Sequence, residues 1–449
     1  MKRGNRLVLT VLAAGLVTVL SCVALWYLGG VRSARAKTAG WQVTRDIPDV
    51  LCTRQLEKGR ETPPATRWVR DYQSASWLSG LNLLVAPDGT AYRVIIENVV
   101  DSATGSVYRP ALVTAFTPRG KTLWSKKLAP AAPGYDEVCP ALDLQGNLYL
   151  LVSIYTDEPG HCNLKLLKLS GTGQRLWSRE YDGYWPSSEA LAVSSAGDAY
   201  VAATTPSRDH LVLRRVDPNG NELWARPLAL GFRKGYEPLA RSMIVKGDGE
   251  IVIAGRHCQG IEDLKDTEYR PSFLGTVDSE GRRVRMELMP KSGYEILGLA
   301  RDWQDNVYVC GLGYGGGSPS HSAGHGRSDH FLPHQHGFVV KYSSKGDRLW
   351  GRTVGCDGTS VVLSLATDSK GHVYATGYRR PFSGPASVKT TSFLRKLAPD
   401  GGLLWEKCLS NDSAFRPRRV ATGPQGEVLV VGHQGSGTRD KAWLSKLGP

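Results

Sequence analysis

The sequence lacks the short motifs that mark the commonest catalytic machineries. Its 449 residues contain no His-Glu-x-x-His pair, no Gly-x-Ser-x-Gly elbow and no Gly-x-x-x-x-Gly-Lys-Ser/Thr loop. These motifs hold a catalytic zinc ion, a serine nucleophile and nucleotide phosphates, respectively. Their absence argues against a zincin protease, an α/β-hydrolase and a P-loop nucleotidase. We therefore expect no catalytic residues and no cofactor.

Cysteine is scarce and forms no zinc-binding spacing. The chain has eight Cys and no Cys-x-x-Cys pair. Of the repeats described below, one holds both Cys139 and Cys162, while Cys258/Cys310 and Cys356/Cys408 lie at comparable places in neighbouring repeats. This grouping predicts three disulfides with Cys52 left over and agrees with an oxidising compartment, although spacing alone does not fix connectivity.

Long blocks of one charge are also missing. The net charge is +14, but residues 1–36 carry five Lys or Arg and no acid, so removing these five from +14 leaves +9 for the rest. The remaining basic residues are scattered among acids, which argues against nucleic-acid binding.

Helical periodicity is scarce after one long apolar run, Leu7–Leu28, which is flanked by basic residues. About 20 apolar residues suffice to cross a bilayer, whereas a cleaved signal has a shorter core. We expect residues 1–36 to be an uncleaved anchor. Two alternatives stay open: cleavage near Ala34-Arg35-Ala36, and lipidation at Cys22. All three place the rest of the chain outside the cytoplasm: we expect it to be anchored in the cytoplasmic membrane of a bacterial cell envelope, with a secreted protein or a lipoprotein as the alternatives.

One phrase, a Gly turn followed by an aliphatic residue and Trp, recurs along the chain. It occurs at Gly120–Trp124, Gly173–Trp177, Gly220–Trp224, Gly346–Trp350 and Gly401–Trp405, with a degenerate copy at Gly281–Arg285. A second turn, followed by a strand rich in Val, Ile, Leu and Tyr, occurs seven times, at 87–92, 144–149, 195–200, 247–252, 303–308, 369–374 and 424–429. Two turns per repeat predict two hairpins, and hence four strands.

The repeats predict an all-β fold: a seven-bladed β-propeller of four-stranded antiparallel blades over residues 66–449. Residues 1–36 would form one N-terminal hydrophobic helix, and 37–65 a linker. The seventh repeat ends before its outer strand, and Thr66–Tyr72 resembles the missing strand. We expect this N-terminal strand to close the ring and remove the open sheet edges. The recurrent Trp side chains should fill the wedges between blades: Trp68, Trp124, Trp177, Trp224, Trp350 and Trp405.

The combined pattern is Asp-x-x-Gly-Asn-x-Tyr, as at 143–149, followed by Gly-x-x-Leu-Trp. It resembles the bacterial seven-bladed propeller repeats called SBBP repeats and, more loosely, quinoprotein-like (PQQ-like) repeats. The resemblance implies a secreted or envelope-bound propeller, often used in protein contact. Quinoprotein dehydrogenases use eight blades and often an adjacent Cys-Cys pair, and this chain has neither.

Two groups of residues are candidate sites on the face opposite the tight turns, where the connections vary in length. The first pairs Tyr with acids just before the innermost strands, and could hold a sugar or a basic peptide: Tyr135, Asp136, Glu137, Tyr184, Glu189, Tyr236, Glu237, Tyr294 and Glu295. The alternative is that these Tyr pack between blades and the acids accept backbone hydrogen bonds.

The second group is a Gly- and Ser-rich insertion that holds five of the ten His residues: His321, His325, His330, His334 and His336. Imidazole is a common ligand of divalent metals, but this spacing matches no structured zinc site. A metal site and a mobile polar insertion both stay open.

These observations predict a non-enzymatic, membrane-tethered platform that binds an envelope or extracellular protein. One alternative is a carbohydrate-binding or carbohydrate-cleaving propeller that recognises a glycan. Another is a quinone- or metal-dependent oxidoreductase.

Overall fold

The computed structural model describes fourteen segments of the chain, all within the compact unit Trp41–Pro449. They are 59–74, 78–100, 107–128, 135–156, 161–184, 189–207, 209–228, 236–259, 272–288, 294–314, 335–354, 358–381, 390–435 and 440–448. Within these segments no helix is long and apolar enough to cross a membrane. The predicted N-terminal helix, including Leu7–Leu28, lies outside them.

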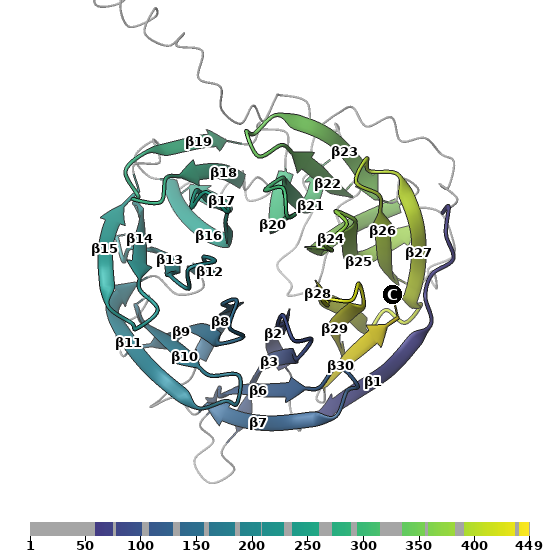
Figure 1. Ribbon diagram of the computed structural model, residues 1–449, viewed down its shortest axis with the longest axis horizontal. Helices are drawn as coiled ribbons and strands as arrows, with labels where there is room; N and C mark the ends of the chain where they lie inside the picture. The colour runs from purple at the N-terminus through teal and green to yellow at the C-terminus, as the bar shows by residue number, and fades with distance from the viewer. Residues whose placement is uncertain are drawn as a thin grey trace, which may run out of the picture. The chain divides into compact units, whose positions relative to one another are not determined.

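The described residues form seven four-stranded antiparallel sheets arranged as the blades of a propeller (Figure 1). Blade 1 contains β2 (Leu78–Val85), β3 (Ala91–Glu97), β6 (Ala111–Phe116) and β7 (Thr122–Leu128); blade 2 contains β8 (Tyr135–Leu142), β9 (Leu148–Tyr155), β10 (Cys162–Leu169) and β11 (Arg175–Tyr184); blade 3 contains β12 (Glu189–Val193), β13 (Ala199–Thr204), β14 (Leu211–Val216) and β15 (Glu222–Pro227). A small hairpin, β4 (Val99–Val100) with β5 (Val107–Tyr108), extends blade 1.

The remaining blades repeat this order. Blade 4 contains β16 (Tyr236–Val245), β17 (Ile251–Gln259), β18 (Ser272–Val277) and β19 (Val284–Leu288); blade 5 contains β20 (Tyr294–Arg301), β21 (Val307–Tyr314), β22 (Gln335–Tyr342) and β23 (Arg348–Val354); blade 6 contains β24 (Gly358–Thr367), β25 (Val373–Pro381), β26 (Thr391–Leu397) and β27 (Leu403–Ser410); blade 7 contains β28 (Phe415–Thr422), β29 (Val428–Gly435), β30 (Asp440–Leu447) and β1 (Thr66–Gln73). The first strand of each blade is innermost in Figure 1, beside the first strands of its neighbours.

The core lies between the blades rather than within one layer. Each cluster of buried apolar side chains joins two adjacent sheets, as where Tyr92 and Val113 of blade 1 meet Leu148 and Val152 of blade 2. Strands buried on both faces are largely apolar: all seven residues of β3 are buried, and Arg93 and Glu97 are its two charged members.

The second tight turn of each blade explains the Gly of the repeated phrase. Gly220 has a φ of 88°, a left-handed conformation that favours glycine. A Cβ atom there would lie 2.9 Å from the ring of Trp177 in the preceding blade. Glycine is therefore required twice, for the backbone conformation and for the close approach of the indole.

The Trp of the phrase reaches from one blade to the next. Trp177 Nε1 donates to Pro218 O at 2.9 Å, and Arg179 Nε donates to Gly220 O at 2.6 Å. We call this pair of bonds to a neighbouring second turn the Trp clamp. It recurs from blade 7 to 1 through Trp68 and Arg70, from 1 to 2 through Trp124 and Lys126, and from 5 to 6 through Trp350 and Arg352.

Strand β1 supplies the outer strand of the seventh sheet. It runs antiparallel to β30, with Val69 opposite Ser445. Its Trp68 donates to Pro118 O of blade 1 at 3.2 Å, and Lys446 Nζ donates to the same carbonyl at 2.9 Å. How far the ring depends on this strand stays a prediction, for which a test is given below.

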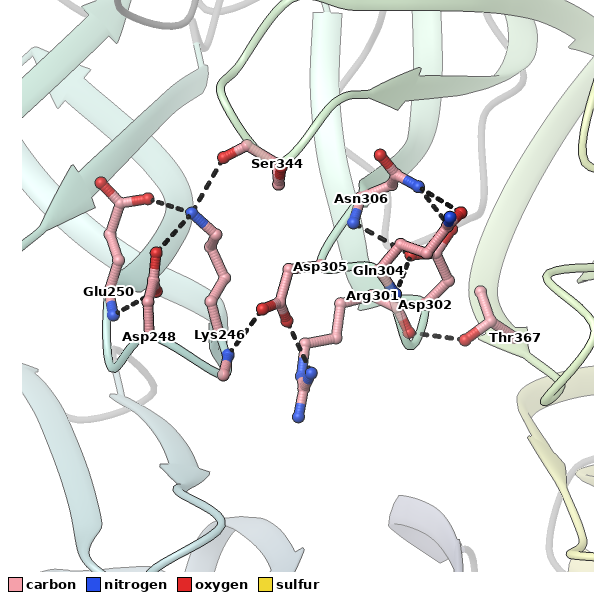
Figure 2. A network of polar contacts seen from close by, with 11 residues as sticks. Lys246, Asp248, Glu250, Arg301, Asp302, Gln304, Asp305, Asn306, Ser344 and Thr367 are labelled. Carbon is pink, nitrogen blue, oxygen red and sulfur yellow. Dashed lines mark hydrogen bonds and ion pairs between the residues drawn. The ribbon is translucent and has the colours of Figure 1, made fainter.

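The junction between blades 4 and 5 is built differently (Figure 2). Arg285 stands where the other blades carry Trp, and β19 pairs with β18 without the register shift seen at the other second turns. Instead, Lys246 Nζ donates to Ser344 O at 2.9 Å, across to the second turn of blade 5. Its ammonium also contacts Glu250 at 2.7 Å and Asp248 at 3.4 Å.

Asp305 completes this polar junction. It has a φ of 60° where the equivalent turns carry Gly, which makes it the one non-glycine residue with positive φ among the described residues. Its carboxylate accepts from Gly247 N at 2.9 Å and from Arg301 Nη1 at 2.7 Å (Figure 2). These bonds tie the first turn of blade 5 to that of blade 4 and offset the backbone strain.

The disulfide predictions that involve Cys310 and Cys408 are wrong. Both carry free thiols: Cys310 is buried mid-strand in the core between blades 5 and 6, and exposed Cys408 Sγ donates to Asn411 at 3.2 Å. Cys139 and Cys162 lie on β8 and β10, which are separated by β9. Strands two apart are about 9.5 Å from each other, beyond the roughly 7 Å limit between Cα atoms of a disulfide.

Candidate functional site

The inner strands begin at the face opposite the tight turns, because each strand runs into a first turn. Tyr135, Glu189, Tyr236 and Tyr294 are the first residues of β8, β12, β16 and β20. The predicted group thus lies at equivalent ends of four neighbouring inner strands. The side chains of Tyr135, Asp136, Glu137, Glu189, Tyr236 and Glu237 lie outside the described set.

Tyr294 and Glu295, whose side chains are described, both contact the protein itself. The Tyr294 ring meets Phe338 edge-on at 5.6 Å, and it lies over Gly313, where a Cβ atom would approach it to 2.4 Å. Glu295 Oε1 forms an ion pair with Arg256 Nη1 on β17 of the neighbouring blade 4 at 3.1 Å. In blade 5 the Tyr-acid pair is therefore part of the packing, the alternative that the sequence left open.

Tyr184 does not lie with the rest of the group, because it ends the outer strand β11 rather than preceding an inner strand. Its buried hydroxyl accepts from Arg214 Nε of blade 3 at 2.9 Å. The same guanidinium lies 4.7 Å from the centre of the Tyr181 ring, and burial raises the pKa of Tyr181 to about 12. This cluster stabilises the junction of blades 2 and 3.

The structure reveals a set of inner-strand positions that sequence reasoning missed. In blades 4 to 7 one inner-strand residue leaves the pairing register with the second strand, forming a β-bulge. These residues are Arg241, Leu297, Leu363 and Arg418. Arg241 and Arg418 are exposed. Because neighbouring blades cover both faces of an inner strand, an exposed side chain in its middle reaches solvent on the axis side.

Blade 7 concentrates positive charge on its inner strand, where Arg416, Arg418 and Arg419 lie within four residues. Arg416 lies over the Tyr378 ring of blade 6 at 4.7 Å, and Arg419 Nε donates to Asn82 of blade 1 at 3.2 Å. Arg418 Nε contacts His433 Nδ1 at 3.4 Å. The sequence signal was the run Arg416-Pro-Arg-Arg419, but only the topology shows that it borders the axis.

The His-rich insertion is represented by His336 alone, which lies on β22. His321, His325, His330 and His334 lie outside the described residues, so the metal prediction stays a prediction. In the part of the chain that is described, no group of three or more His, Cys, Asp or Glu could hold a metal ion.

The residues near the starts of the inner strands differ in charge from blade to blade. Acids belong to blades 2 to 5, and the arginine run belongs to blade 7. Such an arrangement can bind a partner that carries both signs of charge, because complementary charges favour encounter and fix orientation.

No family model matches the chain. One curated relative is the uncharacterized WD repeat-containing protein L264 of Acanthamoeba polyphaga mimivirus, which is 25% identical over 120 residues. The match covers 22% of this chain and only 9% of that relative's length. The relative's overall role therefore provides no basis for assigning one here.

Three solved structures are similar to the chain at low identity. Two are proteins of unknown function, from Bacteroides caccae (16% identity, 62% of this chain and 94% of that chain, TM-score 0.34) and Dyadobacter fermentans (10%, 85% and 99%, TM-score 0.44). The third is the polysaccharide lyase Uly1 (10%, 82% and 89%, TM-score 0.48). None of them carries an argument about activity. The chain is a seven-bladed β-propeller whose structural neighbours include bacterial proteins of unknown function.

Proposed function

We propose that this chain is a non-catalytic binding platform that takes up a protein partner where its inner strands begin. The observation that carries the proposal is the division of charge at these strand ends. Acids stand at the starts of β8, β12 and β16, whereas Glu295 of β20 is ion-paired within the protein to Arg256, and β28 carries three arginines. A protein segment with both acidic and basic residues fits this division better than a uniformly charged ligand does.

The opposite face supports this choice, because its turn residues are occupied by the fold. At the Trp-clamped junctions the second turn receives an indole and a basic side chain from the preceding blade. Long connections of variable length lie on the other face, where binding on rigid scaffolds usually resides.

The location belongs to the same proposal. The apolar run Leu7–Leu28 would tether the propeller outside the cytoplasmic membrane, as in SBBP-type proteins of bacterial envelopes. A platform held at the membrane surface would meet envelope or extracellular partners. The N-terminal tether is tested by fractionating cells that express the full-length chain and a chain without residues 1–36.

The binding test is co-purification of the tagged full-length protein from its native membranes, with bound proteins measured by mass spectrometry. Two charge reversals, Arg418→Glu and Arg241→Glu, change exposed inner-strand residues. Arg282→Glu is the matched control, because Arg282 is exposed on a second turn of the opposite face.

We expect a stoichiometric partner whose recovery falls at least about tenfold in the inner-strand variants and is unchanged in the control. Arg418→Glu places a repulsive charge against the partner's acidic groups, and Arg241→Glu reverses the one exposed basic side chain on the inner strand of blade 4 that the partner would contact. A partner that is recovered equally with all three variants would contradict the proposed site. A protein that purifies without any partner but binds on a glycan array would favour the carbohydrate alternative.

A further inference from the structure

The junction of blades 3 and 4 keeps the repeated Trp phrase but does not make the Trp clamp. Trp224 Nε1 and Arg226 Nε are both buried, and neither has a hydrogen-bond partner among the described residues. At the preceding junction the equivalent side chains, Trp177 and Arg179, donate to two carbonyls of the next second turn. A buried donor without a partner costs stability, so a specific feature of this junction must keep the clamp unmade.

The indole of Trp224 is displaced against the turn that it should clamp. A Cβ atom at Gly220 would meet Trp177 at Cδ2 and Cε2, the bond that the two rings share. A Cβ atom at Gly281 would instead meet Trp224 at Cη2 and Cζ3, both at 2.8 Å. These two atoms form the far edge of the six-membered ring, so the indole N–H is carried away from the turn carbonyl.

The second turn of blade 4 is also one residue longer than its counterpart in blade 3. Asp278 N donates to Arg283 O at 3.1 Å and closes a turn of six residues, 278 to 283. Asp217 N donates to Asn221 O at 2.8 Å and closes a turn of five. The longer turn presents its carbonyls to blade 3 in a different position.

Arg215 of β14 reaches this turn in place of the indole. Its Nη1 donates to Ser279 O at 3.4 Å and contacts Glu280 at 3.2 Å, while Nη2 contacts Asp198 of its own blade at 2.8 Å. At the preceding junction Lys168 stands opposite the Trp and donates, at 3.1 Å, to the same carbonyl as the Trp does. A lysine at this position is therefore compatible with the clamp.

The junction thus holds two sets of donors for one turn. Arg215 binds the turn in this structure, and Trp224 with Arg226 would bind it if the turn moved along the indole. Gly281 already lies against both of these side chains, since a Cβ atom there would be 3.1 Å from Arg226 Cδ. A short movement of the turn would exchange one set for the other, and packed interfaces switch between discrete arrangements of this kind.

We propose that the junction of blades 3 and 4 is a two-state joint that regulates how firmly blade 4 is held. The ion pair of Arg215 with Glu280 keeps the joint open, and loss of that pair lets the Trp224 indole complete the clamp. Half of the Glu280 side chain is exposed, so cations from outside can compete for its carboxylate.

The joint matters for blade 4 in particular. The other side of this blade has Arg285 in place of the Trp, so the junction with blade 3 decides whether the blade is Trp-clamped at all. The inference concerns the outer edge of the ring and does not rest on the inner-strand site proposed above.

The test follows the indole N–H of Trp224 by NMR in the purified full-length protein labelled with ¹⁵N-tryptophan. Trp224→Phe and Trp177→Phe assign the two resonances that are compared. In the wild type we expect the Trp224 resonance to lie upfield of the Trp177 resonance, because only the Trp177 N–H donates a hydrogen bond.

Two variants should close the joint: Arg215→Lys, which copies the lysine of the preceding junction, and Glu280→Gln, which removes the ion pair. Both should move the Trp224 resonance downfield, toward that of Trp177, and slow the exchange of its proton with solvent at least about fivefold. Asp182→Asn is the matched control, because Asp182 is an exposed acid on the outer strand β11. It should change neither quantity.

A wild-type Trp224 resonance that coincides with that of Trp177 and exchanges as slowly would overturn the inference. A Trp224 resonance that Glu280→Gln leaves in place would overturn it as well. Glu280→Gln changes a half-exposed side chain, so it keeps the test decisive even if Arg215→Lys fails to fold.

Discussion

The Trp-clamped junctions and the junction between blades 4 and 5 use different side chains to bind the second turn of the next blade. At the first kind, an indole N–H of one blade reaches the second carbonyl of the next blade's turn, as Trp177 reaches Pro218. At the other, Lys246 reaches the equivalent carbonyl, Ser344 O, from a different turn. At both kinds of junction this carbonyl accepts a hydrogen bond from the preceding blade, and either an indole or an ammonium can supply it.

The two solutions differ in cost. An indole is neutral and buries a large aromatic surface while it donates one hydrogen bond. The Lys246 side chain is almost fully buried, so its ammonium needs the nearby carboxylates of Glu250 and Asp248 to offset its desolvation. The polar junction therefore gains less from apolar burial, and we expect it to be weaker than the Trp-clamped junctions.

The largest effect should follow removal of Gly59–Gln73. This deletion removes β1 from blade 7 and, with it, the hydrogen bond that Trp68 donates to blade 1. It also exposes the edge of β30. We expect the cooperative unfolding transition to be lost and aggregation to increase, as measured by chemical denaturation and light scattering. An unfolding transition like that of the full-length protein would contradict a ring-closing role for β1.

Equivalent truncations at the two kinds of junction should give unequal losses. Trp177→Ala removes a half-buried indole and its bond to Pro218, so we expect a loss of about 2–4 kcal/mol in the free energy of unfolding. Arg285→Ala, at the matching position of blade 4, should change it by less than about 0.5 kcal/mol. Urea denaturation of both variants measures the difference, and equal losses would show that the Trp clamp is not the stronger solution.

Lys246→Met should cost about 1–3 kcal/mol, because it leaves Ser344 O without this donor and Glu250 without its cation. Lys345→Met is the control, since Lys345 is exposed on the same turn of blade 5. Urea denaturation with both variants tests whether Lys246 bridges the junction. A Lys246→Met protein as stable as the control variant would mean that this bridge contributes nothing.

The smallest expected effect is on stability at acid pH. It compares the first turn of blade 6, which begins with Asp368, with the first turn of blade 4. Burial alone would raise the pKa of Asp368, but hydrogen bonds from His372 and backbone N–H groups outweigh it and lower that pKa. The stability from Asp368 is therefore present above the unfolded pKa of about 3.9 and is lost as pH falls through the folded pKa.

Blade 4 carries Lys246 at the corresponding turn position and has no such carboxylate to protonate. Asp368→Asn should flatten the loss of stability between about pH 5 and pH 2, which urea midpoints across this range would reveal. An unchanged slope would mean that other carboxylates dominate acid unfolding.

Most of the fold could be predicted from the repeated turn sequences. Gly220 and Trp177 are spaced as a tight turn and a packing residue require, and the seven first turns predicted seven four-stranded blades. The candidate site was harder to predict from the sequence, because the bulges that expose Arg241 and Arg418 depend on the register between two strands. Lys246 was missed for a similar reason, since its partner Ser344 lies 98 residues away in the next blade.

The disulfide predictions for Cys310 and Cys408 relied on position within a repeat and ignored which strand of the blade a residue occupies. Cys310 lies mid-strand in a core. Tyr184 ends an outer strand, and its assignment to a ligand site stays a prediction. Sequence spacing fixes the order of strands but not the direction in which each side chain points.

Hydrogen exchange of the purified full-length protein, followed by mass spectrometry, tests the central claim that one junction of the ring is weaker than the Trp-clamped ones. We expect β19 and the second turn of blade 5, residues 343–347, to exchange faster than β11 and residues 217–221, their counterparts at a Trp-clamped junction. Equal or slower exchange at the junction of blades 4 and 5 would contradict it.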